Sequence, residues 1–246
     1  MTIAIIQARM GSTRLPGKVL KKVNNIPLLG YQIKRVKQAK KIDKIVIATG
    51  NDRANNVLEK FGHQIKIPVF RGSESDVLDR YYQCALKYPK YNHIVRITGD
   101  CPVIDPAVVD QVITLFQHEK VDYASNVNPP TYPDGMDTEI FTRQVLIKAA
   151  ESAQSKSERE HVTIYIRNNK KFKQANLLSP YDFSHFRLTV DNPEDFEVIK
   201  FLIKNTNINQ GYLNYIALLT KNPRVMQKNM HITRNEGLLM SNYSKN

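Results

Sequence analysis

Short apolar runs alternate along the first half of the chain with longer stretches in which apolar residues recur at helical spacing. The apolar runs predict buried strands at residues 3–6, 43–50, 67–70 and 92–98. Helices are predicted after residues 26–29 and at residues 51–61, 75–87 and 106–120. This alternation predicts an α/β fold with a mostly parallel sheet, covered on both faces and joined by right-handed crossovers. In such sheets ligands bind beyond the carboxyl ends of the strands.

The second half of the chain continues the pattern less regularly. Strands are predicted at residues 122–126, 138–141 and 186–190, and helices at 143–153, from 157, from 193 and at 212–219. Ser157 with Glu160 three residues later forms the pattern of a capping box. Residues 128–137 contain too much proline for a regular element, and residues 226–246 have weak periodicity.

The segment that follows the first strand has the composition of a phosphate site. It contains glycines and cations together, namely Arg9, Gly11, Arg14, Gly17 and Lys18. Glycine lets backbone N–H groups approach an anion, while arginine and lysine supply the opposite charge. The segment matches neither the Walker A pattern nor the G-x-G-x-x-G dinucleotide pattern. A basic surface loop explains the same residues, so on composition alone both interpretations stay open.

Aspartates follow two of the later predicted strands. Asp100 comes just past a glycine at a strand end, where a carboxylate is well placed to hold Mg²⁺ together with substrate phosphates. Asp191 could pair with Asp100 across such a metal. Helix-entry chemistry is the alternative for these aspartates: Asp105 with Pro106 is predicted to begin one helix, and Asp191 or Asn192 to cap another.

Two further groups of residues are weaker candidates. Arg159 and His161 lie near the start of a predicted helix, where amide dipoles favour an anionic ligand. A solvent-exposed pair is the alternative, and the residues alone favour it. The aromatic and acidic residues of the loop at 128–137, Asp137 among them, could form one wall of a pocket, although turn chemistry explains them nearly as well.

Length and charge narrow the functional class. A chain of 246 residues can bury a large core, and we expect one α/β domain. The formal net charge of +13 points to anionic partners such as nucleotides. The lysines are scattered, and no RNA-recognition, GXXG or zinc-finger signature accompanies them, so nucleic-acid binding is a minor hypothesis.

Other compositional features predict where the protein works. No apolar run reaches the roughly 18 residues of a membrane span, and the start of the chain lacks the basic region of a secretory signal, so we expect a cytoplasmic protein. Cys84 and Cys101 lie in unrelated surroundings, which argues against a disulfide or a zinc site.

Taken together, several segments resemble one family. They are residues 7–18, 71–80, 96–102, 159–163 and 189–195. Their sequences and order are similar to those of the spore coat polysaccharide biosynthesis protein F family of cytidylyltransferases, whose relatives include CMP-KDO synthetase and the CMP-sialate synthetases. The likeness covers nearly the whole chain, including residues 234–237.

The resemblance implies a Rossmann-like, three-layer α/β/α nucleotidyltransferase fold of the glycosyltransferase-A type. It implies an enzyme that uses CTP and Mg²⁺ to activate an acidic sugar as its CMP ester, with release of pyrophosphate. It also implies a homodimer, a single domain over residues 1–222 with a substrate and dimerisation insertion at about 126–185, and a tail at 223–246 that packs on the domain.

The resemblance also assigns roles to individual residues. The nucleotide-binding set is Ala8, Arg9, Gly11, Ser12, Arg14, Lys18, Arg71, Asp79 and Arg80, with Ala8 and Arg71 near the cytosine. Arg14, Lys18 and Asp100 are the expected catalytic residues. Asp100 and Asp191 are the expected metal ligands. Arg159, His161 and Asp137 are the expected contacts of the sugar acid.

The chain departs from the family pattern at two positions. Asp134 stands where a basic residue is expected in Tyr-Pro-Arg-Gly, and its carboxylate could change the acceptor by repelling an acidic sugar. Asn192 replaces a threonine and can still cap a helix. The alternatives to a cytidylyltransferase are a nucleotidyltransferase that uses another nucleotide and a sugar phosphate, a glycosyltransferase, and a basic nucleic-acid-binding module.

Overall fold

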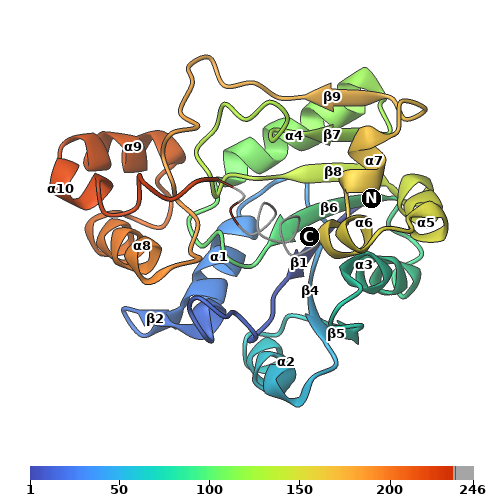
Figure 1. The fold of residues 1–246 in the computed structure, drawn as a ribbon, viewed down its shortest axis with the longest axis horizontal. Coiled ribbons are helices and arrows are strands. Elements are labelled where there is room, and N and C mark those ends of the chain that lie inside the picture. The colour runs from blue at the N-terminus through green and yellow to red at the C-terminus, as the bar shows by residue number, and fades with distance from the viewer. Residues whose placement is uncertain (235, 237–246) are drawn as a thin grey trace, which may run out of the picture.

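A seven-stranded sheet forms the centre of the protein, which is described here from a computed structural model covering residues 1–234 and 236 (Figure 1). The strand order is β5-β4-β1-β6-β8-β7-β9. The strands are β1 Thr2–Gln7, β4 Lys44–Gly50, β5 Val69–Gly72, β6 His93–Thr98, β7 Tyr123–Ser125, β8 Glu139–Thr142 and β9 Gln174–Asn176. The β5-β4-β1-β6 half is parallel, whereas β8 runs antiparallel to both β6 and β7. The predicted mostly parallel sheet is therefore confirmed.

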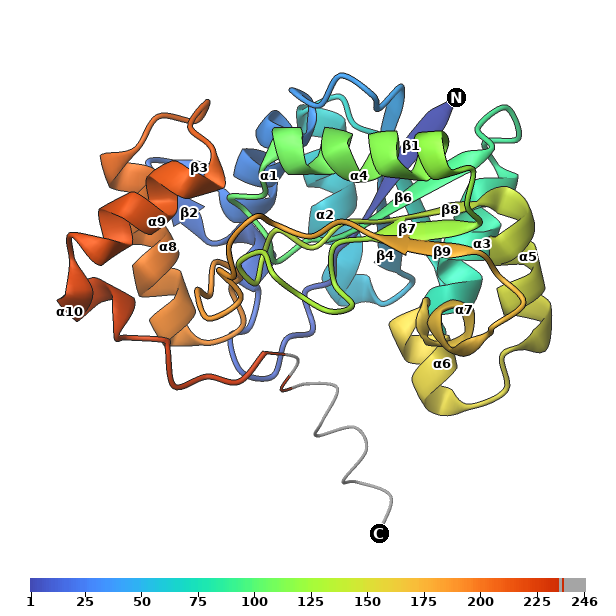
Figure 2. The same ribbon diagram turned by 90° about the horizontal axis from the view of Figure 1, so that it is seen from above.

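Helices cover both faces of the sheet, as the alternating pattern predicts, and Figure 2 shows the sheet between α4 and the α6–α7 pair. The helices are α1 Leu28–Val36, α2 Asn56–Gln64, α3 Val77–Leu86, α4 Pro106–Glu119, α5 Arg143–Ser152, α6 Lys156–His161, α7 Ile164–Asn168, α8 Pro193–Asn205, α9 Tyr212–Thr220 and α10 Pro223–Met226. Short elements complete the chain: η1 Lys18–Leu20, β2 Lys22–Val23, β3 Ile26–Pro27 and η2 Arg53–Asn55.

Strand β1 shows why the sheet needs cover on both sides. Ala4 and Ile6 pack with α1, α2 and α4, while Ile3 and Ile5 pack with α3 and α5 on the opposite face. All four side chains are fully buried, because successive strand residues point to opposite faces. Burying an isoleucine contributes roughly 1.5–3 kcal/mol, so this strand anchors both layers.

A third apolar cluster joins the C-terminal helices to one end of the sheet. Val198 and Leu202 of α8 and Tyr215 of α9 pack against Leu188 and Val190. Beyond α10 the chain contacts the start of α8, since the Asn229 Nδ2 atom donates to the Asp195 carboxylate at 2.9 Å. Residues 235 and 237–246 lie outside the described residues, and the predicted tail at 223–246 stays a prediction. The predicted boundary at 222 and the insertion at 126–185 stay predictions.

The strand predicted at residues 186–190 is wrong. This segment is extended, but its only ladder contact among the described residues is an isolated bridge between Asp134 and Arg187. Its backbone instead bonds to two loops, with Leu188 N donating to Asp134 O and Val190 N to Asp100 O at 2.9 Å. The segment nevertheless places Asp191 near Asp100, since one lysine ammonium contacts both carboxylates, as the predicted metal site requires.

The helix predicted from residue 157 begins earlier and is interrupted. Ser155 is the N-cap of α6: its Oγ accepts from Glu158 N at 3.2 Å, and the Glu158 carboxylate accepts from Ser155 N at 3.0 Å. The sequence contains the Ser-x-x-Glu pattern twice, at 155–158 and 157–160, and the first copy caps the helix. Val162 adopts a φ of 60°, which ends α6 and separates it from α7.

The helix predicted at 51–61 begins later, at Asn56 after the short turn η2, whereas the helix starts predicted at 106, 143, 193 and 212 are confirmed. The Asp105 carboxylate accepts from Ala107 N at 2.9 Å at the start of α4, with Pro106 in the first helical position. Asn192 is the N-cap residue of α8, with Pro193 following.

Both cysteines are free thiols. Within residues 1–234 and 236, no helix has the length and apolar character needed to cross a membrane.

Substituting the α6 cap tests its position. We expect Ser155→Ala to lower the free energy of unfolding by about 1 kcal/mol, because an orphan helix amide loses its acceptor. The matched control Ser157→Ala is expected to change it by less than about 0.5 kcal/mol. Urea denaturation followed by circular dichroism measures both. A larger loss for Ser157→Ala than for Ser155→Ala would contradict the assignment.

Candidate active site

The candidate site lies at the carboxyl ends of β1 and β6. This is the topological switch point of the sheet, because β4 and β5 extend it on one side of β1 and β6 extends it on the other. Gly99 lets the two loops touch, since its N–H donates to Gln7 O at 2.7 Å. A Cβ added to Gly99 would lie 2.8 Å from Gln7 O and 3.0 Å from the Ala8 Cβ, closer than side chains tolerate. Glycine at this position therefore brings Asp100 to the basic loop that follows β1.

A cavity of ≈ 460 Å³ opens at this place. Its lining comprises Gln7, Ala8, Arg9, Gly11, Ser12, Thr13, Arg14, Lys18, Val19, Ser75, Val77, Arg80, Arg96, Thr98, Gly99, Asp100, Lys156, Glu160, His161 and Asp191. Most of the residues that the sequence nominated for the nucleotide, the metal and catalysis are therefore gathered around one cavity.

The loop after β1 is folded by its own hydrogen bonds. Met10 O accepts from Ser12 N at 2.9 Å and from Gly17 N at 3.2 Å, which closes the loop on itself. Gly17 adopts a φ of 66°, which favours glycine, and the next residue begins η1. Asn55 fixes the loop from outside, since its Oδ1 accepts from Met10 N at 2.9 Å. These hydrogen bonds fix the backbone from which the Lys18 side chain extends.

Lys18 lies between the two predicted metal ligands. Its Nζ atom is 3.2 Å from Asp100 Oδ2 and 2.7 Å from Asp191 Oδ1. Arg14 is a second cation at Asp191, because its Nη2 atom lies 3.2 Å from the same Oδ1 oxygen. Although burial opposes it, the Lys18 ammonium lowers the pKa of Asp100 to about 2. Asp100 is therefore an ionised carboxylate at neutral pH.

A buried arginine that sequence reasoning missed holds Asp191 from behind. Arg187 Nη2 is 2.9 Å from Asp191 Oδ2, and Arg187 Nε is 2.8 Å from the Asp195 carboxylate. Asp195 in turn accepts from Asp191 N at 2.9 Å. The signal that could have revealed this role is a charged residue between the apolar neighbours Phe186 and Leu188.

Asp134 belongs to the same buried cluster and not to the cavity lining. Its carboxylate is 2.7 Å from Arg187 Nη1, and its side chain is only 12% exposed. The expectation that Asp134 faces and repels an acidic acceptor is therefore corrected: the residue supports Arg187. Burial, with the nearby Asp137 carboxylate, raises the pKa of Asp134 to about 7.

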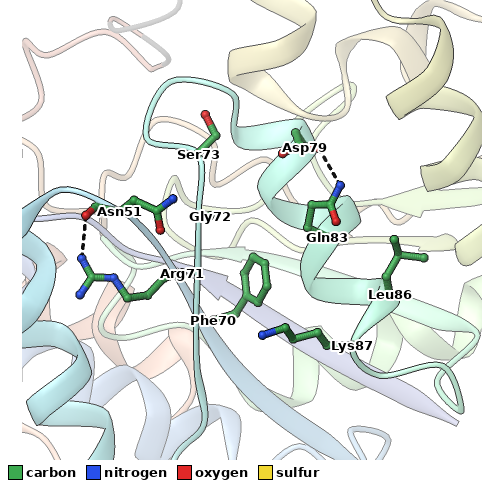
Figure 3. Close-up of a pocket in the computed structure, with 9 residues that line it drawn as sticks. All are labelled: Asn51, Phe70, Arg71, Gly72, Ser73, Asp79, Gln83, Leu86 and Lys87. Carbon is green, nitrogen blue, oxygen red and sulfur yellow. Dashed lines mark hydrogen bonds between the residues drawn. The ribbon is translucent and has the colours of Figure 1, made fainter.

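Two residues predicted to border the nucleotide lie elsewhere. Arg71 and Asp79 line a separate depression between β5 and α3 (Figure 3). The Arg71 guanidinium turns away from the cavity, because it donates to Asn51 O and Asp52 O at 2.9 Å each. Asp79 accepts from Gln83 on the next turn of its helix at 3.1 Å. The structure does not bring these side chains to the nucleotide site.

Two of the residues predicted to contact the sugar acid form ion pairs instead and do not line the cavity. Arg159 Nη2 is 2.6 Å from Asp76 Oδ2, which joins α6 to the start of α3. Asp137 Oδ1 is 2.5 Å from Arg234 Nη2, which ties the C-terminal segment to the loop before β8. Of the three residues predicted to contact the sugar acid, His161 alone lines the cavity, and burial lowers its pKa.

Arg96 is a cavity residue that the sequence did not single out. It lies on β6 directly opposite Glu139 of β8 and forms an ion pair with it. The Glu139 carboxylate also accepts from the Tyr123 hydroxyl at 2.6 Å, so a buried polar chain crosses three strands beneath the cavity. An arginine inside the apolar run Ile94-Val95-Arg96-Ile97 was the available signal.

The donor chemistry at Asp100 and Asp191 fits a hard divalent cation. Both carboxylates converge on one cation, the Lys18 ammonium, and carboxylate oxygens are ligands that Mg²⁺ accepts together with substrate phosphates. No cluster of three or more potential side-chain ligands exists among the described residues. A metal here would take its remaining ligands from water or from the oxygen atoms of a bound substrate.

The raised pKa of Asp134 predicts a pH effect on stability. Its folded-state pKa of about 7 exceeds the ordinary 3.8, so between these values the folded protein binds more protons here than the unfolded chain. The resulting stabilisation is present at low pH and is lost as the pH rises through 7. We expect the thermal midpoint of the wild type to fall relative to Asp134→Asn between about pH 5 and about pH 8. Parallel profiles in scanning fluorimetry would contradict this.

Comparison with known proteins identifies the family of the chain. A family model described as cytidylyltransferase matches residues 3–234. The spore coat polysaccharide biosynthesis protein SpsF of Bacillus subtilis (strain 168) is 38% identical over 233 residues, which cover 89% of this chain and 94% of that protein. An 8-amino-3,8-dideoxy-manno-octulosonate cytidylyltransferase of Shewanella woodyi is 34% identical over 122 residues, 49% of each protein.

A solved structure shows the same fold. The cytidylyltransferase from Leptospira borgpetersenii serovar Hardjo-bovis is 34% identical, and it superposes with a TM-score of 0.88 over 95% of this chain and 99% of that one. The family match, the SpsF relative and the solved structure each span nearly the whole sequence, whereas the octulosonate cytidylyltransferase matches about half of it. The resemblance seen in the motifs is thus confirmed, and the chain belongs to the cytidylyltransferase family.

Proposed function

We propose that this enzyme transfers CMP from CTP to an acidic sugar of the ulosonic or nonulosonic type, with release of pyrophosphate, for surface polysaccharide biosynthesis. The observation that carries the proposal is the placement of Lys18 between Asp100 and Asp191 in the cavity at the ends of β1 and β6. The names of the relatives support the chemistry: one is a cytidylyltransferase of an octulosonate, and one is named for polysaccharide biosynthesis.

The β1 loop is suited to a triphosphate. Arg9, Arg14 and Lys18 line one cavity together with Gly11 and Ser12, so cations and backbone N–H groups come from the same short segment. Arginine offers paired donors to phosphate oxygens, and lysine offers a compact charge. In this proposal these side chains bind and orient the nucleotide phosphates.

Mg²⁺ is the proposed cofactor, and Asp100 and Asp191 are the residues that would hold it. When bound, the ion would neutralise phosphate charge and lower the pKa of the acceptor hydroxyl. Arg187 keeps the Asp191 carboxylate oriented towards Asp100. Asp100 is ionised at neutral pH and needs no proton loss before it can act as a ligand.

The reaction needs positioning and positive charge more than a covalent enzyme intermediate. The acceptor hydroxyl gives its proton to water, and its oxygen bonds to the α-phosphorus as the bond from that phosphorus to the bridging oxygen of pyrophosphate breaks. Negative charge grows on the phosphate oxygens, and Arg14 and Lys18 are the side chains placed to stabilise it.

The acceptor side of the proposal rests on cavity residues from β6 and α6. Arg96, Lys156 and His161 belong to the lining, and the cations Arg96 and Lys156 would suit a sugar carboxylate. The Glu139 partner fixes the Arg96 guanidinium in the cavity wall before any substrate arrives. The homodimer implied by the family resemblance and the cytoplasmic location expected from the composition stay predictions.

A substrate panel tests the reaction. With Mg²⁺ present, we expect pyrophosphate release with CTP and an octulosonic or nonulosonic acid, and little release with ATP, GTP or UTP. Pyrophosphate is measured by a coupled phosphatase assay, and the CMP ester by mass spectrometry. Release with UTP and a sugar phosphate would support the other nucleotidyltransferase class, and no release with any pair would overturn the proposal.

Removing one carboxylate tests the assignment of the site. We expect Asp100→Asn to lower turnover about a hundredfold or more, because the group that would hold the metal loses its charge. The exposed Asp182→Asn serves as the matched control and is expected to keep wild-type turnover. Thermal unfolding checks that each variant is folded. Full activity in a folded Asp100→Asn enzyme would rule out this role.

A further inference from the structure

Lys18 occupies the position between two carboxylates that a metal ion would need. Its ammonium contacts both Asp100 and Asp191 within 3.2 Å, and its side chain is only 12% exposed. The side chain leaves the backbone at the start of η1, directly after the left-handed Gly17. Lys18 is thus a buried counter-ion for the two aspartates as well as a residue of the phosphate loop.

The Asp191 carboxylate has cationic partners on both of its oxygens. Oδ1 is contacted by Lys18 and by Arg14, while Oδ2 is contacted by Arg187. These partners differ in their access to a substrate. Lys18 and Arg14 line the cavity, whereas Arg187 has a 5% exposed side chain and lies behind the carboxylate. A ligand in the cavity can therefore draw away the first two cations and leave the third in place.

From these contacts we infer that Lys18 keeps a divalent cation out of the nucleotide-free site, so that the metal binds together with CTP and not before it. This inference rests on the proposed function. The Lys18 ammonium and a divalent ion repel each other and compete for the same carboxylate oxygens. A triphosphate offers Lys18 and Arg14 alternative anionic oxygens and also supplies oxygen ligands to the metal.

The geometry explains why the carboxylates stay in place when Lys18 leaves. Arg187 and the backbone contact of Asp191 N with Asp195 hold Asp191 independently of the loop. Asp100 is fixed through its carbonyl oxygen, which accepts from Val190 N at 2.9 Å and from the Thr189 hydroxyl at 3.1 Å. Without the ammonium, the Asp191 carboxylate therefore keeps its cationic partner Arg187, and the backbone of Asp100 keeps its position.

Metal binding to the nucleotide-free enzyme tests the inference. Mn²⁺ serves as the probe, and its free concentration is measured by electron paramagnetic resonance. We expect Lys18→Met to bind Mn²⁺ about tenfold more tightly than the wild type, a factor within the usual range of coupling between two ligands. The matched control is Lys22→Met, a change at an exposed lysine of the neighbouring β2, which should leave Mn²⁺ affinity unchanged.

A second measurement adds CTP. We expect CTP to tighten Mn²⁺ binding strongly in the wild type and less in Lys18→Met, in which the competing ammonium is already gone. Lys18→Gln repeats both measurements with a polar side chain, in case the methionine variant does not fold, and circular dichroism verifies the fold. Equal Mn²⁺ affinity in the wild type and in folded Lys18 variants would overturn the inference.

The outcomes separate this inference from the proposed function. An enzyme that releases pyrophosphate from CTP, but binds Mn²⁺ equally well with and without CTP, overturns only the role of Lys18. A protein that binds no Mn²⁺ with CTP and releases no pyrophosphate contradicts the proposed function, and with it the inference. Asp100→Asn, measured in parallel, should weaken Mn²⁺ binding in every state and so shows that the probe reports on this site.

Discussion

The close contact between the β1 and β6 loops is the constraint on which the site depends. Gly99 donates to Gln7 O at 2.7 Å, and only a residue without a Cβ fits there. This contact brings the Asp100 carboxylate, which follows β6, close to Lys18, which belongs to the basic loop after β1. The parallel half of the sheet supplies the two strand ends, and the helices on both faces bury the strands that carry them.

Charge neutralisation organises the surroundings of that contact. Arg187 lies within ion-pair distance of Asp134, Asp191 and Asp195, so carboxylates outnumber their buried cation. Burial, with the nearby Asp137 carboxylate, raises the pKa of Asp134, while Asp191 has Lys18 as a second cationic partner besides Arg187. An anionic substrate that entered the cavity would add negative charge. It would also offer the cations Lys18 and Arg14 new partners in place of Asp191.

Hydrophobic periodicity predicted most of the fold because the strands and helices of the parallel half have strong local patterns. It failed at residues 186–190, a segment whose backbone bonds to two loops and does not join a ladder of the sheet. The motifs located Lys18 and Asp100, because residues that follow neighbouring parallel strands converge by topology, and Asp191, which follows the segment at 186–190. They misplaced Arg71 and Arg159, because side-chain direction depends on partners such as Asn51 and Asp76 that no local pattern identifies.

The end of the chain takes part in the same charge cluster. Asn229 donates to Asp195, which holds Asp191 N, while Arg234 pairs with Asp137 and Glu236 lies 2.5 Å from Arg14. Residues from both ends of the sequence thus surround one carboxylate. During synthesis on the ribosome, the sheet can form from earlier segments, but the surroundings of Asp191 are complete only after nearly the whole chain has emerged. A chain truncated after α10 would therefore lack the contacts that Asn229, Arg234 and Glu236 add to this cluster.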